Sequence, residues 1–119
     1  MAERRSYENY FRKVLEIDLL KQQYPYDREI LQEILDLVVD TVCSKREYIR
    51  IASDDRPRDV VKSRFMKLDS GHIQYVMDCL KENTTDVRNI KQYLLAALYN
   101  APGTISSYYS AKVNHDLYG

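Results

Sequence analysis

Histidine, cysteine and serine are among the side chains of this chain that could act as nucleophiles, proton carriers or metal ligands. His72 and His115 are far apart in the sequence, and neither belongs to an HExxH or CxxC pattern typical of zinc sites. Cys43 and Cys79 are also widely separated, so no redox dithiol is indicated. Ser70 lies near His72, but a helix-capping role explains this serine better than nucleophilic chemistry. We therefore expect no enzyme, no metal and no cofactor.

Phosphate cradling by a glycine-rich loop is not indicated either, because the chain contains neither GxxxxGK[ST] nor GxGxxG. Both cysteines lie in apolar segments with helical periodicity, where we expect buried free thiols. The sequence has no charged leader followed by an apolar core, and no apolar run of the roughly 18 residues that a membrane span needs. We expect a protein of the reducing cytoplasm that has no membrane partner.

Positively charged side chains are concentrated in one part of the chain, although its formal net charge is zero. Residues 14–40 contain seven acidic and two basic side chains, whereas residues 45–67 contain eight basic and four acidic ones. The sum of the charges therefore hides an acidic part and a basic part. The basic part is the first candidate for a contact with a polyanion.

Within the basic part, the spacing of the cations favours a nucleic-acid contact. Arg58 and Lys62 are four residues apart, so a helix would place both on one face beside phosphates. Arg64 and Lys67 belong to the same expected element. The alternative interpretation is a solvated helix face, because runs of charge commonly serve only to keep a helix soluble.

A second set of contacts is predicted on the segment NIKQYLLAALYNAP and the residues just before it. Arg88 and Lys91 belong to the polar side of this segment, and the Tyr93 ring could stack on an unpaired base. Alternatively, Tyr93 is a boundary residue like Tyr75 and Tyr99, with its ring in the core and its hydroxyl group in water. The predicted nucleic-acid contacts are Arg58, Lys62, Arg64, Lys67, Arg88, Lys91 and Tyr93.

These side chains need a scaffold, and the hydrophobic periodicity predicts one that is mainly all-α. A chain of 119 residues is suited to a single domain with one core. We expect a compact bundle of about five helices, with the option of one short strand or a β-hairpin near residues 48–65. A first helix is expected to begin near Ser6, to extend through Leu20 and to break at the YPYD sequence. The central helix follows Asp27 as N-cap and carries a wide apolar stripe.

Residues 48–67 allow two interpretations. Alternation over residues 48–52 favours a strand, and the following residues could supply the return arm of a hairpin. Against a return arm, Asp55 as N-cap and Pro57 in the first turn compose a helix start, with Asp59 near the end of that turn. We favour a helix over residues 57–67.

Two further helices are predicted. One follows Asp69 or Ser70 as its cap and ends near ENTT. The other opens at residues 85–86 and is expected to end at residues 102–103, a Pro-Gly pair. The tail, residues 104–119, has too few apolar positions for a confident helix but enough to fold back onto the bundle.

Three stretches of the sequence are distinctive together: TVCSKREYIRIASDDRPRDVVKSRFMKLD, HIQYVMDCLKENT, and NIKQYLLAALYNAP followed by YYSAKVNHDLYG. They resemble the C-terminal domain of replication initiator protein A of Gram-positive plasmids and integrative conjugative elements. The resemblance runs from about Tyr24 to Gly119. It implies that residues 24–119 form the helical C-terminal domain of a replication initiator. Residues 1–23 would then be an N-terminal helix, partly a linker to an origin-binding winged-helix domain and partly residues added in cloning.

A weaker likeness connects the segment NIKQYLLAALYNAP to DnaD-type replication proteins, whose helical domain ends in a pattern associated with single-stranded DNA. Tyr93 and Leu94 match the start of that pattern, and Ala97 and Leu98 match its middle. Ala101 stands where the family has a tryptophan. The ring that would stack on a base is therefore missing at this position.

The residues and the resemblance together lead to two expectations about function. The first is a non-catalytic helical domain of a replication initiator, which contacts DNA, single- or double-stranded, or a host replication protein such as a helicase loader. The alternative is a module for protein–protein interaction or self-association that does not bind DNA. Such a module would dock through the acidic face of the central helix or through the tyrosine-rich tail.

Overall fold

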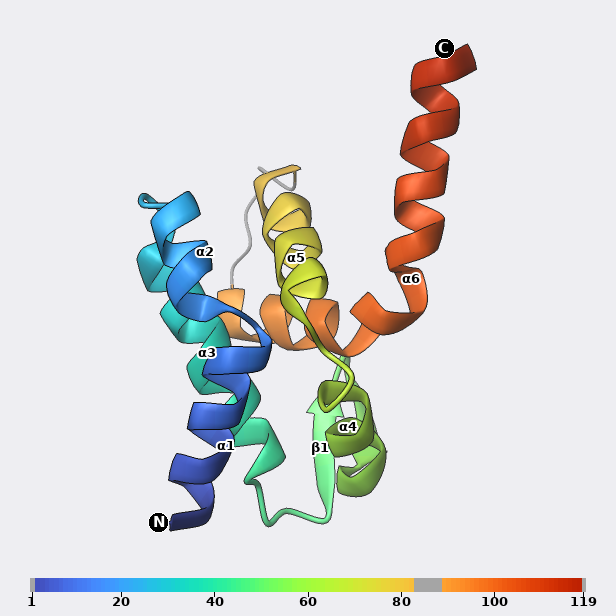
Figure 1. The fold of residues 1–119 in the computed structure, drawn as a ribbon. Coiled ribbons are helices and arrows are strands. Elements are labelled where there is room, and N and C mark those ends of the chain that lie inside the picture. Colours follow the sequence, from blue (N-terminus) through green and yellow to red (C-terminus); the bar gives the residue numbers. More distant parts are fainter. Residues whose placement is uncertain (1, 83–88, 119) are drawn as a thin grey trace.

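The computed structural model shows a mainly helical chain with one small antiparallel sheet (Figure 1). It describes the backbone of residues 2–82 and 89–118 and the side chains of residues 2–82 and 89–104. Over these residues the order of elements is α1 (Ala2–Val14), α2 (Ile17–Gln23), α3 (Arg28–Val42), β1 (Tyr48–Ile51), β2 (Asp54–Pro57), α4 (Arg58–Phe65), α5 (Ser70–Glu82) and α6 (Ile90–Tyr118). The predicted fold class, a helical bundle with a hairpin, is confirmed.

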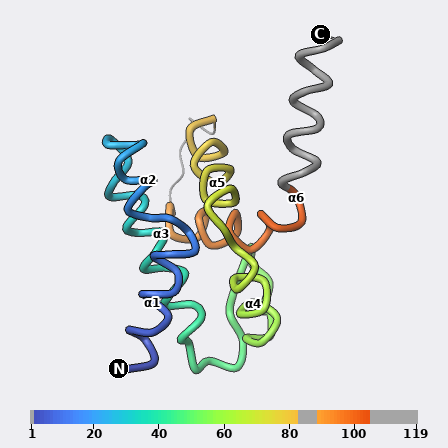
Figure 2. The backbone as a smooth tube through the Cα atoms, viewed as in Figure 1, coloured from blue at the N-terminus to red at the C-terminus, as the bar shows by residue number. Residues whose placement is uncertain are grey.

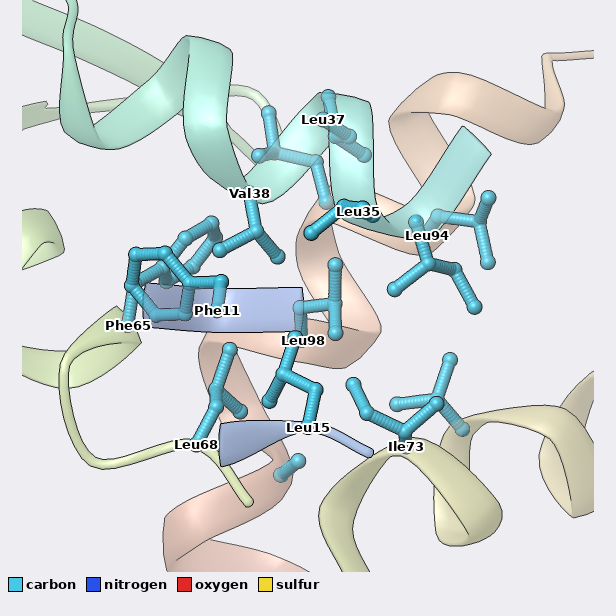
Figure 3. Close-up of a cluster of buried hydrophobic side chains, with 14 of the residues drawn as sticks. Phe11, Leu15, Leu35, Leu37, Val38, Phe65, Leu68, Ile73, Leu94 and Leu98 are labelled. Atoms are coloured by element: carbon cyan, nitrogen blue, oxygen red, sulfur yellow. The ribbon is translucent and has the colours of Figure 1, made fainter. Parts of the chain in front are cut away.

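The central position of α3 follows from its sequence, because apolar residues occupy more than one side of this helix. Its buried residues are Leu31, Ile34, Leu35, Leu37, Val38, Val39, Thr41 and Val42. α1, α2, α4 and α6 all contact it. Figure 3 shows side chains from separate elements meeting beside α3, among them Phe11, Phe65, Ile73 and Leu98. Burial of this many aliphatic and aromatic groups is the main source of the stability of the fold.

The first helical segment is divided, and the prediction of one continuous helix through Leu20 was wrong. α1 begins at Ala2, before the expected Ser6, and Glu16 after its end has a φ of 54°. Leu15 and Ile17 are both fully buried. In a straight helix, residues two positions apart point about 200° away from each other, so they could not share one core. The left-handed residue between them resolves this conflict.

The hairpin and the helix that were alternatives for residues 48–67 both occur, one after the other. β1 pairs antiparallel with β2, with Ile51 opposite Asp54. The helix expected over residues 57–67 is observed as α4, Arg58–Phe65, and its N-cap position is Pro57. The prediction of Asp55 as N-cap was therefore wrong. Asp55 belongs to β2, where its carboxylate is 3.4 Å from the Arg50 guanidinium across the hairpin.

Two helix starts agree with the sequence. α3 begins directly after Asp27, and α5 begins directly after Asp69. Asp69 Oδ1 accepts a hydrogen bond from the His72 backbone N–H at 3.1 Å, while His72 Nδ1 accepts one from the Asp69 N–H at 3.0 Å. This reciprocal pair has the form of a capping box, with histidine in place of the usual glutamate.

The end expected for the last helix was wrong, because α6 continues through Pro102. Proline cannot donate a hydrogen bond to the preceding turn and its ring clashes with a carbonyl there, so inside a helix it produces a kink or a break. Figure 2 shows that the coloured part of α6 changes direction along its length. The expected opening of this helix at residues 85–86 lies outside the described residues, as does the expected packing of the tail side chains. Among the described helices, none is long and apolar enough to cross a membrane.

Candidate nucleic-acid interface

The α4 helix places Arg58 and Lys62 on one face, as their spacing predicts. Together with Lys45, these two side chains line a groove of about 190 Å³ formed where the ends of α1 and α3 meet α4. Glu3 and Asp59 also line this groove, and the Asp59 carboxylate is 3.9 Å from the Arg58 guanidinium. The groove is therefore positively charged but not exclusively so.

Lys62 has a partner within the protein. Its ammonium group lies 5.3 Å from the centroid of the Tyr7 ring. A hydrogen bond with Tyr7 raises the pKa of Lys62 above its ordinary value, so this side chain is fully charged at neutral pH. A phosphate in the groove would have to compete with Tyr7 or share Lys62 with it.

Arg64 does not join the other cations of α4. Its guanidinium lies 4.3 Å from the centroid of the Tyr99 ring, and its Nη1 donates a hydrogen bond of 3.2 Å to the Tyr99 carbonyl. Lys67 lies beyond the end of α4, is exposed, and lines none of the described grooves. Of the four cations predicted in this segment, the structure brings only Arg58 and Lys62 together.

Lys91 lies in a different groove, of about 300 Å³, between the end of α3, β1 and the start of α6. Arg46 and Arg50 line the same groove, with Asp40 and Gln92. Asp40 is already paired with Arg4 of α1 at 2.5 Å. Three cations from two distant parts of the sequence therefore meet around this groove.

The Tyr93 side chain does not line the groove that Lys91 lines. Its ring is partly buried and packs against the hydrophobic core, as the boundary interpretation expected for Tyr93 and Tyr75. Tyr99 is buried more deeply, and two arginine side chains approach its ring. Arg88 lies outside the described residues. The partly buried Tyr93 ring and the buried Tyr99 ring are less accessible to a base than an exposed ring is.

Ser44 lines both grooves and joins them into one surface. We call the cations of the two grooves the Ser44 basic surface: Lys45, Arg46, Arg50, Arg58, Lys62 and Lys91. Within residues 2–82 and 89–104, Lys45, Arg46 and Lys91 have no ion-pair partner. Their charges are therefore the most available to a ligand.

Sequence reasoning singled out three members of this surface and missed Lys45, Arg46 and Arg50. The signal that could have found them is the net charge of residues 45–67, to which all three contribute. Within residues 45–67, helical periodicity predicted contacts only from the segment that forms α4 and the residues just after it. These three residues precede that helix, in the connection after α3 and in β1.

Other reactive groups in this region have limited chemistry. Cys43 lines the smaller groove, and burial raises the pKa of its thiol, which disfavours the reactive thiolate. Cys43 and Cys79 are both free thiols. Among the described residues, no group of three or more histidine, cysteine, aspartate or glutamate side chains is placed to hold a metal ion.

Comparison with known proteins identifies a family to which the chain is similar. The family model described as "Family of unknown function (DUF6017)" matches residues 1–119, the whole chain. No curated protein and no solved structure matches the chain.

Proposed function

The chain belongs to this family, DUF6017, and we propose that its helical domain binds the phosphate backbone of nucleic acid through the Ser44 basic surface. The observation that carries the proposal is the gathering of six cations around one serine. They come from the connection after α3, from β1, from α4 and from α6. Side chains from separate elements can follow a curved backbone in a way that a single helix face cannot.

The charge distribution supports a local rather than a global attraction. The chain as a whole is neutral, so the field far from its surface does not attract a polyanion. Near Ser44, six cations face three acidic side chains, Glu3, Asp40 and Asp59. Asp40 is paired with Arg4, whereas Asp55 and Asp59 lie beside Arg50 and Arg58 of this surface. The cations still outnumber the acids, so phosphates would encounter a net positive surface. The expected affinity is modest and falls steeply with salt.

An exposed ring near this surface favours a single strand. Tyr48 at the start of β1 is 53% exposed, and it lines a small cleft with Arg58 and Pro57. A phenol ring beside a phosphate-binding cation can stack on an unpaired base, whereas the bases of a duplex are stacked on one another. Tyr48 therefore replaces Tyr93 as the proposed stacking residue.

The resemblance to replication initiators gives this contact a biological setting. We propose that the domain serves an initiator of plasmid or integrative-element replication in the cytoplasm, and that it acts without catalysis. Single-stranded DNA is exposed when an origin opens, which suits a surface that contacts backbone and bases without reading a long sequence.

Fluorescence anisotropy with labelled single- and double-stranded oligonucleotides tests the proposal. Between about 50 and about 300 mM salt, each phosphate contact to a single strand contributes roughly −0.7 to the slope of log K against log salt. Engagement of about four or five phosphates predicts a slope near −3 and tighter binding of the single strand. Absence of binding at the lowest salt, or an affinity that does not change with salt, would contradict the proposal.

A further inference from the structure

A row of acidic side chains lies along α3, next to the Ser44 basic surface. Glu33, Asp36 and Asp40 follow one another at spacings of three and four, which places them on one side of the helix. They line a groove of about 180 Å³ together with Leu37 and Lys91. We call these three carboxylates the α3 acidic row.

The charges of this row are only partly compensated within the chain. Asp40 pairs with Arg4, and Asp36 accepts a hydrogen bond from the Gln32 amide at 3.0 Å. In the part of the chain that the structure describes, neither Glu33 nor Asp36 has a cation within ion-pair distance. These two carboxylates are available to a positively charged partner.

The acidic groove and the larger basic groove share an edge. Leu37, Asp40 and Lys91 line both of them. Arg46 and Arg50 belong only to the basic side, and Glu33 and Asp36 only to the acidic side. The surface thus changes the sign of its charge across a narrow boundary.

A boundary of this kind is self-complementary. In a two-fold dimer the same patch is used by both subunits, so each feature must meet a feature that fits it. A two-fold axis through the shared edge would bring the acidic side of one copy against the basic side of the other, twice. We propose that this face binds a second copy of the chain, with Glu33 and Asp36 of each copy facing Arg46 and Arg50 of the other.

The composition of the face indicates a weak and reversible contact. Leu37 and Leu95 at the bottom of the grooves are almost completely buried already, so association would remove little further apolar surface from water. The attraction is mainly between exposed charges, which salt screens over about 10 Å at 0.1 M. The dimer should therefore form at low salt and high concentration.

The dimer would cover Arg46, Arg50 and Lys91, the cations proposed to contact phosphates. This consequence rests on the proposed function: nucleic acid and a second copy would compete for the same side chains. Each would then weaken the binding of the other by the same factor, as linkage requires. The dimer itself does not depend on nucleic-acid binding.

Sedimentation velocity of the whole chain tests the dimer directly. At about 50 mM salt, the sedimentation coefficient should rise with protein concentration, and at about 500 mM salt it should stay at the monomer value. A monomer at every concentration and low salt would overturn the proposal. An association that persists unchanged in high salt would also overturn it, because its source would not be these charges.

Charge reversal distinguishes this face from any other. The variant Glu33→Lys/Asp36→Lys and the variant Arg46→Glu/Arg50→Glu should each dimerise at least about ten-fold more weakly, because like charges then meet. An equimolar mixture of the two should associate again, since every contact between them is attractive. A control that loses as much charge as the arginine variant, Lys13→Glu/Lys67→Glu, changes exposed cations outside these grooves and should behave like the wild type.

The two proposals can fail separately. If the mixture does not associate, or if either variant alone still dimerises like the wild type, the dimer is excluded whatever the anisotropy shows. If only nucleic-acid binding fails, the proposed function is wrong, but the sedimentation results still support the dimer. The wild-type chain could also stay monomeric and bind a lysine-rich peptide along the α3 acidic row. That result would overturn the dimer and show that the partner of this face is a basic peptide.

Discussion

Arg64 and Tyr99 form a link between α4 and α6. The Arg64 guanidinium lies 4.3 Å from the centroid of the Tyr99 ring, and Nη1 donates a hydrogen bond of 3.2 Å to the Tyr99 carbonyl. Arg56 of β2 approaches the same ring at 4.8 Å. One buried ring therefore connects the hairpin and α4 to the last helix. Both arginines stabilise the fold through Tyr99. A ligand could bind either guanidinium only if its contact with this ring were broken.

Replacing Tyr99 tests this link. Tyr99→Leu keeps apolar volume but removes the ring, and it should lower the free energy of unfolding by about 1–3 kcal/mol, since two cation–π contacts are lost. Tyr99→Phe keeps the ring and should cost less than about 1 kcal/mol. Urea denaturation measures both values. Equal losses in the two variants would show that the ring face contributes nothing.

Arg64→Ala separates a structural role from a role in binding. We expect a loss of about 1–2 kcal/mol in the free energy of unfolding, because the hydrogen bond and the ring contact both disappear. The affinity for oligonucleotides should remain within about two-fold of the wild type at a temperature where the variant is folded. Lys67→Ala, an exposed cation of the same segment, should change stability by less than about 0.5 kcal/mol. A large loss of affinity in Arg64→Ala with unchanged stability would reverse this assignment.

The hairpin turn offers a stabilising substitution. Ala52 and Ser53 have φ values of 53° and 68°, and they form the two-residue loop between the paired residues Ile51 and Asp54. Positive φ at both positions is typical of a type I′ turn, which favours Asn-Gly. The double variant Ala52→Asn/Ser53→Gly should therefore raise the free energy of unfolding by about 1 kcal/mol. A decrease on thermal or urea unfolding would argue against this turn.

Cys43 should make stability depend on alkaline pH. Burial raises the pKa of its thiol, so the folded state holds the proton at a pH where the unfolded state releases it. The contribution of the thiol to stability is complete below the unfolded pKa of about 8.5, and it is lost as the pH rises through the folded pKa. The free energy of unfolding should fall more between pH 8 and about pH 10 in the wild type than in Cys43→Ala. Identical pH profiles would show that burial does not affect this thiol.

The helices could be predicted from the sequence because the patterns that indicate them involve residues close together in the chain. The apolar stripe of α3 and the cap at Asp69 depend on neighbours within a few residues. The hairpin turn and the break at Glu16 were harder, since residues other than glycine occupy the left-handed conformations there. Packing of the strands and of Leu15 and Ile17 imposes these conformations from outside the segment.

The candidate site was less accessible, because it depends on contacts between distant segments. Lys91 meets Arg46 and Arg50 only when α6 packs beside β1. Spacing along α4 correctly grouped Arg58 with Lys62, but it could not indicate that Arg64 turns toward Tyr99. Periodicity gives the face of a helix and leaves open which neighbour covers that face.

The central claim is that phosphates bind at the Ser44 basic surface. The most direct test is anisotropy with a single-stranded oligonucleotide on two double variants that lose the same amount of charge, Arg46→Glu/Lys91→Glu in the grooves and Lys13→Glu/Lys67→Glu outside them. We predict that the groove variant binds roughly thirty-fold more weakly, with a salt slope about two contacts smaller, while the other stays near the wild type. Equal weakening in both variants would contradict the claim, because the attraction would then follow net charge and not this surface.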